Sequence, residues 1–187
     1  GFTIQNGYDC EGGGMECNYG SSPTLTDLII TNNTSTCNGG GIQIEQSSPI
    51  LSNIIISSNY APNGGGIFIW KDDSNVILNN VDIVNNNANY GAGIKITTNA
   101  TVNLSNSTIS GNSAQLGGAI NSDSNSNEEI NFYFENGIIS ENSATSGGAF
   151  YINGNSVFNV ENSHISNNTV DSNGGSGAVA WITESSV

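Results

Sequence analysis

The sequence predicts an all-β fold: a right-handed parallel β-helix of about seven coils of 25–30 residues, with three short strands in each coil. Three observations lead to this prediction. A glycine-rich motif recurs along the chain, columns of isoleucine and asparagine recur in step with it, and the apolar residues alternate with a period of two. A coil of this length cannot bury a core alone, but stacked coils can.

The glycine-rich motif consists of small residues, mostly glycine, followed by an apolar residue. Successive copies begin 25 to 30 residues apart: GGGM at Gly12, GGGI at Gly39, GGGI at Gly64, GAGI at Gly91, GGAI at Gly117, GGAF at Gly147 and SGAV at Ser176. We expect these glycines at bends where a side chain would clash or where φ is positive.

An isoleucine column follows the same repeat and comprises Ile4, Ile30, Ile56, Ile83, Ile109, Ile139 and Ile165. In six of the seven copies, asparagine stands three residues after this isoleucine, and asparagine or aspartate stands three residues before it. Asparagine tolerates left-handed turn conformations, and stacked asparagines can bond to one another. The pattern therefore predicts turns that carry an asparagine ladder.

The three strands of each coil are expected in a fixed order. The first follows the glycines, where Ile42 and Ile44 alternate with polar residues; the second carries an apolar column that begins at Leu25 and Leu51; the third carries the isoleucine column. Residues 1–187 are expected to form one β-helix domain, a segment of a longer repeat protein or fibre. Its coils would continue into flanking coils or associate end to end with other copies.

The composition excludes several classes of partner. The formal net charge is −14, with no arginine and only two basic residues, Lys71 and Lys95. Nucleic acids are held mainly by Lys and Arg, so nucleic-acid binding is excluded, and anionic membranes and polyuronates would be repelled as well. No apolar run is long enough for a membrane span.

Two of the motifs carry a family resemblance. GGAI at 117–120, GGAF at 147–150 and the repeated I-x-x-N resemble the GGA(I/L/V) and F-x-x-N repeats of polymorphic outer-membrane proteins. The wider pattern GGGI-x-I-x-x-S-S-P-x-L-S-N-x-x-I is similar to the right-handed β-helix repeats of secreted and cell-surface proteins. The resemblance implies an extracellular or cell-surface protein with an adhesive or structural role.

The cysteines and the glycosylation sequons bear on the compartment. Cys10 and Cys37 occupy equivalent positions two residues before a GGG triplet, which predicts a disulfide and an oxidising environment. Cys17 aligns with Ile44 and is expected to be a buried thiol. Asn32 and Asn99, near predicted turns, are the glycosylation candidates.

The strand after the glycines also supplies candidate binding residues. Phe68, Trp70 and Tyr151 are expected to point outward and offer flat faces to sugar rings, and Lys95 lies on the same face. The competing interpretation is that these side chains only cover the sheet or contact a partner module.

A catalytic function is the alternative to a structural one. Glu16 and Glu45, from adjacent coils, could approach the upper end of the spacing of two glycosidase carboxylates, but the sequence around them gives no indication of burial. Asp72 and Asp73, in a turn, are candidate calcium ligands, and His164 is expected at the surface. No cofactor is expected. We predict a non-catalytic extracellular stalk or filament subunit; the alternative is a carbohydrate-binding or polysaccharide-degrading β-helix protein.

Overall fold

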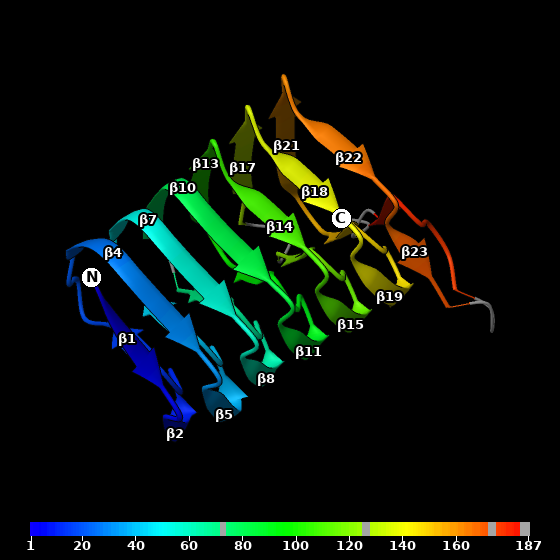
Figure 1. The fold of residues 1–187 in the computed structure, drawn as a ribbon. Coiled ribbons are helices and arrows are strands. Elements are labelled where there is room, and N and C mark those ends of the chain that lie inside the picture. Colours follow the sequence, from blue (N-terminus) through cyan, green and yellow to red (C-terminus); the bar gives the residue numbers. More distant parts are fainter. Residues whose placement is uncertain (72–73, 125–127, 172–174, 184–187) are drawn as a thin grey trace.

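The protein winds into a parallel β-solenoid in which each coil stacks on the one before it (Figure 1). The structure, a computed structural model, describes residues 1–71, 74–124, 128–171 and 175–183. Every strand pair among these residues is parallel, so the predicted fold class is confirmed. Within the same ranges no helix is long and apolar enough to cross a membrane.

The strands form three sheets, named here A, B and C. Sheet A contains β1 (Phe2–Gln5), β4 (Thr24–Thr31), β7 (Ile50–Ser57), β10 (Ser74–Val84), β13 (Ala100–Ser105), β14 (Thr108–Ser110), β17 (Ile130–Glu135), β18 (Ile138–Ser140), β21 (Ser156–Glu161) and β22 (His164–Ser166). Sheet B contains β2 (Tyr8–Glu11), β5 (Thr34–Asn38), β8 (Tyr60–Asn63), β11 (Asn87–Tyr90), β15 (Ser113–Leu116), β19 (Ser143–Ser146) and β23 (Thr169–Val170). Sheet C contains β3 (Met15–Cys17), β6 (Ile42–Glu45), β9 (Ile67–Trp70), β12 (Ile94–Thr97), β16 (Ile120–Asp123), β20 (Phe150–Asn153) and β24 (Ala180–Thr183).

The strands within a coil are not placed as the sequence pattern predicted. The expected second and third strands both lie in sheet A, where β4, β7 and β10 each run through both segments without a break. Sheet B lies between the asparagine ladder and the glycines, a segment for which no strand was predicted. Its inward side chains are small, as at Ser35, Ala61 and Ala88, so it lacks the large apolar residues by which a strand is recognised.

The core is filled by side chains from sheets A and C. The isoleucine column of sheet A is inaccessible to solvent at Ile30, Ile56, Ile83, Ile109 and Ile139. Sheet C contributes a matching set, which includes Ile42, Ile44, Ile67, Ile69, Ile94 and Ile96. Each residue packs against its counterpart in the neighbouring coil, and burial of this repeated apolar surface is the main force that stabilises the stack.

The asparagine ladder is present and buried. It comprises Asn33, Asn59, Asn86, Asn112, Asn142 and Asn168, and each Nδ2 group up to Asn142 donates to the Oδ1 atom of the next member at 2.9–3.1 Å. The same Nδ2 groups also donate to the backbone of the isoleucine column, as Asn112 does to Ile83 O at 2.9 Å. The ladder thus satisfies the polar groups of a buried turn between sheets A and B.

The other asparagine column has a different role. Its members have left-handed backbone with φ of 48–55° and bend the chain within sheet A: Asp27, Asn53, Asn80, Asn106, Asn136 and Asn162. The glycines also behave as predicted. Gly39 has φ of +61°, and a Cβ atom at Gly40 would lie 2.5 Å from the carbonyl oxygen of Gly65 in the next coil.

Candidate functional site

Three of the four predicted binding residues, Phe68, Lys95 and Tyr151, lie at the corner where sheet B turns into sheet C, which we call the B–C corner; Trp70 follows at the end of β9. The B–C corner contains two columns: the last residues of the sheet B strands (Glu11, Asn38, Asn63, Tyr90, Leu116 and Ser146) and the second residues of the sheet C strands (Glu16, Gln43, Phe68, Lys95, Asn121 and Tyr151). The turn between the two sheets is short, and the columns contact each other across it. Gln43 Nε2 donates to Glu11 Oε2 at 3.3 Å, and Lys95 Nζ lies 6.0 Å from the ring centroid of Tyr90.

This contact changes the exposure expected for the candidate residues. Phe68, Trp70, Lys95 and Tyr151 alternate with the core isoleucines or their counterparts, but Phe68 and Lys95 are only 6% and 5% exposed. Trp70 and Tyr151 are half-buried. The expectation that all four side chains are open to solvent is therefore wrong for Phe68 and Lys95, because the edge of sheet B packs against them.

The four candidates do not converge on one point either. The rings of Phe68 and Trp70 are 6.5 Å apart, and Lys95 is the in-register neighbour of Phe68 in the next coil. Tyr151 lies two coils beyond Lys95. Whether these side chains bind a ligand remains a prediction.

Lys95 is held by polar partners inside the corner. Its Nζ group donates to Asn121 Oδ1 and lies 3.4 Å from Asp123 Oδ2, both in the following coil. Burial lowers the Lys95 pKa from its ordinary value, and the charge of Asp123 opposes this shift. Lys95 thus connects the coil that contains β12 to the coil that contains β16.

Lys71 contributes an interaction that the sequence pattern did not indicate. Its Nζ group pairs with Glu45 of the preceding coil and lies 4.8 Å from the ring centroid of Trp70. The hydrogen bond to Glu45 raises the Lys71 pKa above its ordinary value. Lys71 follows β9 directly, and only the stacking of coils brings it to Glu45.

Three carboxylates gather at the first coils of the B–C corner. Glu11, Glu16 and Glu45 each place a carboxylate oxygen within 4.8 Å of the others. Glu16 and Glu45 were expected to approach each other, whereas Glu11 was not foreseen because it belongs to the unrecognised sheet B. Glu11 and Glu16 are exposed, and Glu45 is buried. A hard, oxygen-rich cluster of this kind can hold a metal cation.

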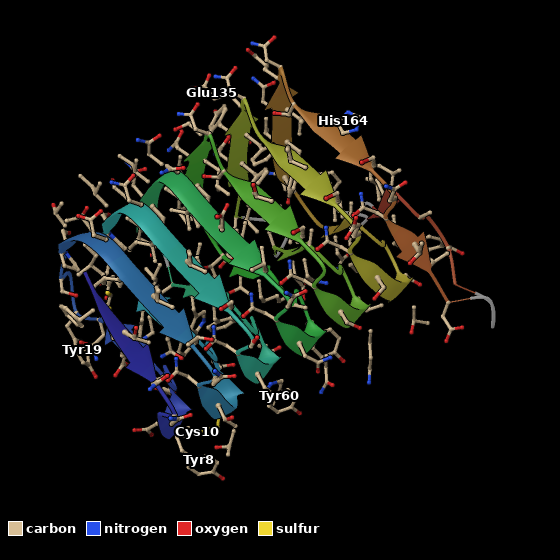
Figure 2. The ribbon with its side chains drawn as sticks, viewed as in Figure 1. Tyr8, Cys10, Tyr19, Tyr60, Glu135 and His164 are labelled. Carbon is tan, nitrogen blue, oxygen red and sulfur yellow. A yellow bond between two sulfur atoms is a disulfide. The ribbon has the colours of Figure 1, made fainter. Side chains whose placement is uncertain are left out.

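A second surface lies on the outer face of sheet A and was missed by the sequence analysis. Ile77, Asn103, Leu104, Ser105, Tyr133, Phe134, Glu135, Asn159 and Glu161 line a pocket of about 310 Å³. Tyr133 is 38% exposed. Glu135 stands at the end of β17 (Figure 2), and it pairs in register with Glu161 of β21. The sequence does contain a signal for this ring: Tyr133 stands between Phe132 and Phe134, and in a strand the middle one of three successive side chains points to the opposite face.

The cysteines are placed as predicted. Cys10 and Cys37 form a disulfide that joins β2 to β5. Cys17 is a free, buried thiol in register with Ile44, and burial raises its pKa, with a further contribution from the charge of Glu16.

The remaining candidates are dispersed over the surface. Asn32 and Asn99 are both exposed, and Asn99 Oδ1 accepts a hydrogen bond from the Glu129 backbone at 2.7 Å. His164 is exposed on β22 (Figure 2). Asp72 and Asp73, the predicted calcium ligands, lie outside the described residues. Glycosylation at Asn32 and Asn99 stays a prediction.

Comparison with known proteins adds one finding. The model of a family described as "right handed beta helix region" matches residues 2–136. No curated protein and no solved structure gives a significant match.

Proposed function

This chain belongs to the right-handed β-helix family, and from that premise we propose that it is a non-catalytic, extracellular stalk or filament unit with an adhesive or structural role. The observation that carries the proposal is the continuity of the stack. Sheet B and sheet C each contribute one strand per coil, and the asparagine ladder connects six successive coils. Such a stack makes a stiff rod whose faces repeat from coil to coil.

Two further observations support an extracellular setting. The Cys10–Cys37 disulfide is of a kind that persists in oxidising compartments. The GGAI and GGAF motifs, at Gly117 and Gly147, resemble those of surface-exposed passenger proteins. End-to-end association with other copies, or continuation into flanking coils, would extend the rod.

Negative-stain electron microscopy of the native, unproteolysed protein tests this proposal. Seven stacked coils at the usual strand spacing of about 4.8 Å account for a rod of roughly 30 Å. We expect fibres or stalks of uniform width that are several times longer than this. Particles no longer than the rod itself would contradict a stalk or filament role.

Carbohydrate binding is the second candidate function, and the sheet A pocket is the observation that favours it. The exposed ring of Tyr133 is flanked by the amides of Asn103 and Asn159 and by two carboxylates, a combination suited to stacking and hydrogen bonding with a sugar. The net charge of −14 favours neutral polysaccharides over polyuronates.

Retention on immobilised neutral polysaccharides tests this candidate. If the sheet A pocket binds sugar, Tyr133→Ala loses retention; if the aromatic side chains of β9 do, Trp70→Ala loses it. Tyr8→Ala, which removes an exposed ring from sheet B, serves as the control and should behave like the wild type. If neither Tyr133→Ala nor Trp70→Ala changes retention, the carbohydrate function is rejected.

A further inference from the structure

We propose that Glu11, Glu16 and Glu45, together with Gln43, form a calcium-binding site that connects the first two coils at the B–C corner. This site is independent of the stalk and carbohydrate functions proposed above. It also differs from the pair Asp72 and Asp73, for which the sequence suggested calcium binding.

The chain brings the ligands together through its turns and register. Gly12, with φ of +61°, begins the tight turn that brings Glu11, the last residue of β2, close to Glu16 in β3. Glu16 is the register neighbour of Gln43, and Glu45 ends the same strand as Gln43. Two strands of one coil and one strand of the next thus converge on a single point.

The spacing of the oxygens suits calcium. Two ligands of one ion can be no further apart than twice the metal–oxygen distance, which is about 4.6–5.2 Å for Ca²⁺ and about 4.2 Å for Mg²⁺. The three carboxylates lie within 4.8 Å of one another, inside the calcium range. Because Glu11 and Glu16 are exposed, water can complete the coordination shell.

Gln43 provides the independent observation. Its side chain is inaccessible to solvent, and its Oε1 atom has no hydrogen-bond partner. The hydrogen bond from Nε2 to Glu11 holds the amide at the edge of the carboxylate cluster. A buried carbonyl oxygen without a partner is costly, and a cation bound among the carboxylates would supply that partner.

Lys71 lies at the same site and would compete with a calcium ion for Glu45. Its ammonium group pairs with Glu45, so one positive charge faces three carboxylates. The Lys71 side chain is 43% exposed and can move into solvent when calcium takes its place at Glu45. Calcium binding would then also separate Lys71 from the ring of Trp70.

Calorimetric titration of the folded protein with calcium chloride tests the site. We expect one saturable event with a Kd of about 10⁻⁴–10⁻³ M, the range of extracellular calcium modules. Glu16→Gln and Glu11→Gln change exposed residues and should weaken binding about tenfold or more, and Gln43→Leu should weaken it while leaving the charge unchanged. Lys71→Met removes the competing cation and should tighten binding.

The matched control is Glu135→Gln, which changes a member of the neighbouring carboxylate pair in sheet A. It should leave calcium binding unchanged, and circular dichroism should show that every variant used is folded. The proposal is overturned if no saturable binding occurs, if Glu135→Gln weakens binding as much as Glu16→Gln, or if magnesium binds as tightly as calcium. The last two results would indicate a diffuse counterion atmosphere.

Discussion

At the residue scale, asparagine has two separate structural roles within the same coil. Asn112 is fully buried and takes part in the ladder, whereas Asn106 is exposed and adopts φ of +52°. They stand three residues after and three residues before Ile109. The first role depends on an amide that both donates and accepts, and the second depends on tolerance of left-handed backbone.

We predict that Asn112→Ala destabilises the fold by about 3 kcal/mol or more. The substitution removes the acceptor of the backbone N–H and of one Nδ2 hydrogen of Asn86 and the donor to the carbonyl of Ile83, and each buried polar group that loses its partner costs roughly 1–3 kcal/mol. Urea unfolding followed by circular dichroism measures the change. Asn106→Gly is the control and should cost no more than about 1 kcal/mol, because glycine accepts the same φ. Equal losses for both variants would contradict the assignment of roles.

At the scale of the elements, each strand is stabilised by its counterparts rather than by its neighbours in sequence. Sheet B has small inward side chains, and its first strands contain a register shift between Asp9 and Glu11. The Cys10–Cys37 disulfide spans this irregular pair and fixes β2 on β5. The bond therefore stabilises the part of sheet B where regular pairing is weakest.

We predict that removing this disulfide destabilises the protein by about 3.5 kcal/mol. The bond closes a loop with a sequence separation of 27, and the chain-entropy estimate for such a loop gives this value. Thermal unfolding of Cys10→Ala/Cys37→Ala, compared with the wild type, measures the effect. Adding a reductant should lower the wild-type midpoint to that of the double variant and leave the double variant unchanged. A midpoint insensitive to reductant in the wild type would refute the prediction.

At the scale of the whole molecule, the coil is the unit of stability. Asn87 pairs in register with Ser113, and Ile83 pairs with Ile109, so residues one coil apart are structurally interchangeable. If the coil between them were removed, Ile83 would therefore meet Ile139 in the same register. The stability of the fold is then the sum of the contributions of the coils and of the interfaces between them, as expected for a solenoid.

We predict that deleting residues 87–112, one complete coil, leaves a folded protein. The deletion joins Asn86 to Ser113 and lets the asparagine ladder continue from Asn86 to Asn142. Deleting only residues 100–112 removes half a coil and places polar residues opposite the isoleucine column, which should abolish folding. Circular dichroism and cooperative urea unfolding distinguish the two variants. Failure of the whole-coil deletion to fold would show that stability is not distributed among the coils.

The sequence by itself determined the fold class, the coil length, the isoleucine core column, the asparagine ladder and the disulfide. All of these repeat at equivalent positions, and repetition can be read from the chain without knowing how it bends. The tertiary structure alone placed sheet B, because its inward side chains are too small to give an apolar pattern. It also decided that Phe68 and Lys95 are buried, that Tyr133 lines a pocket, and that Glu11 joins Glu16 and Glu45. These outcomes depend on which side chains of different strands and neighbouring coils pack against one another, and the pattern along a single strand does not contain that information.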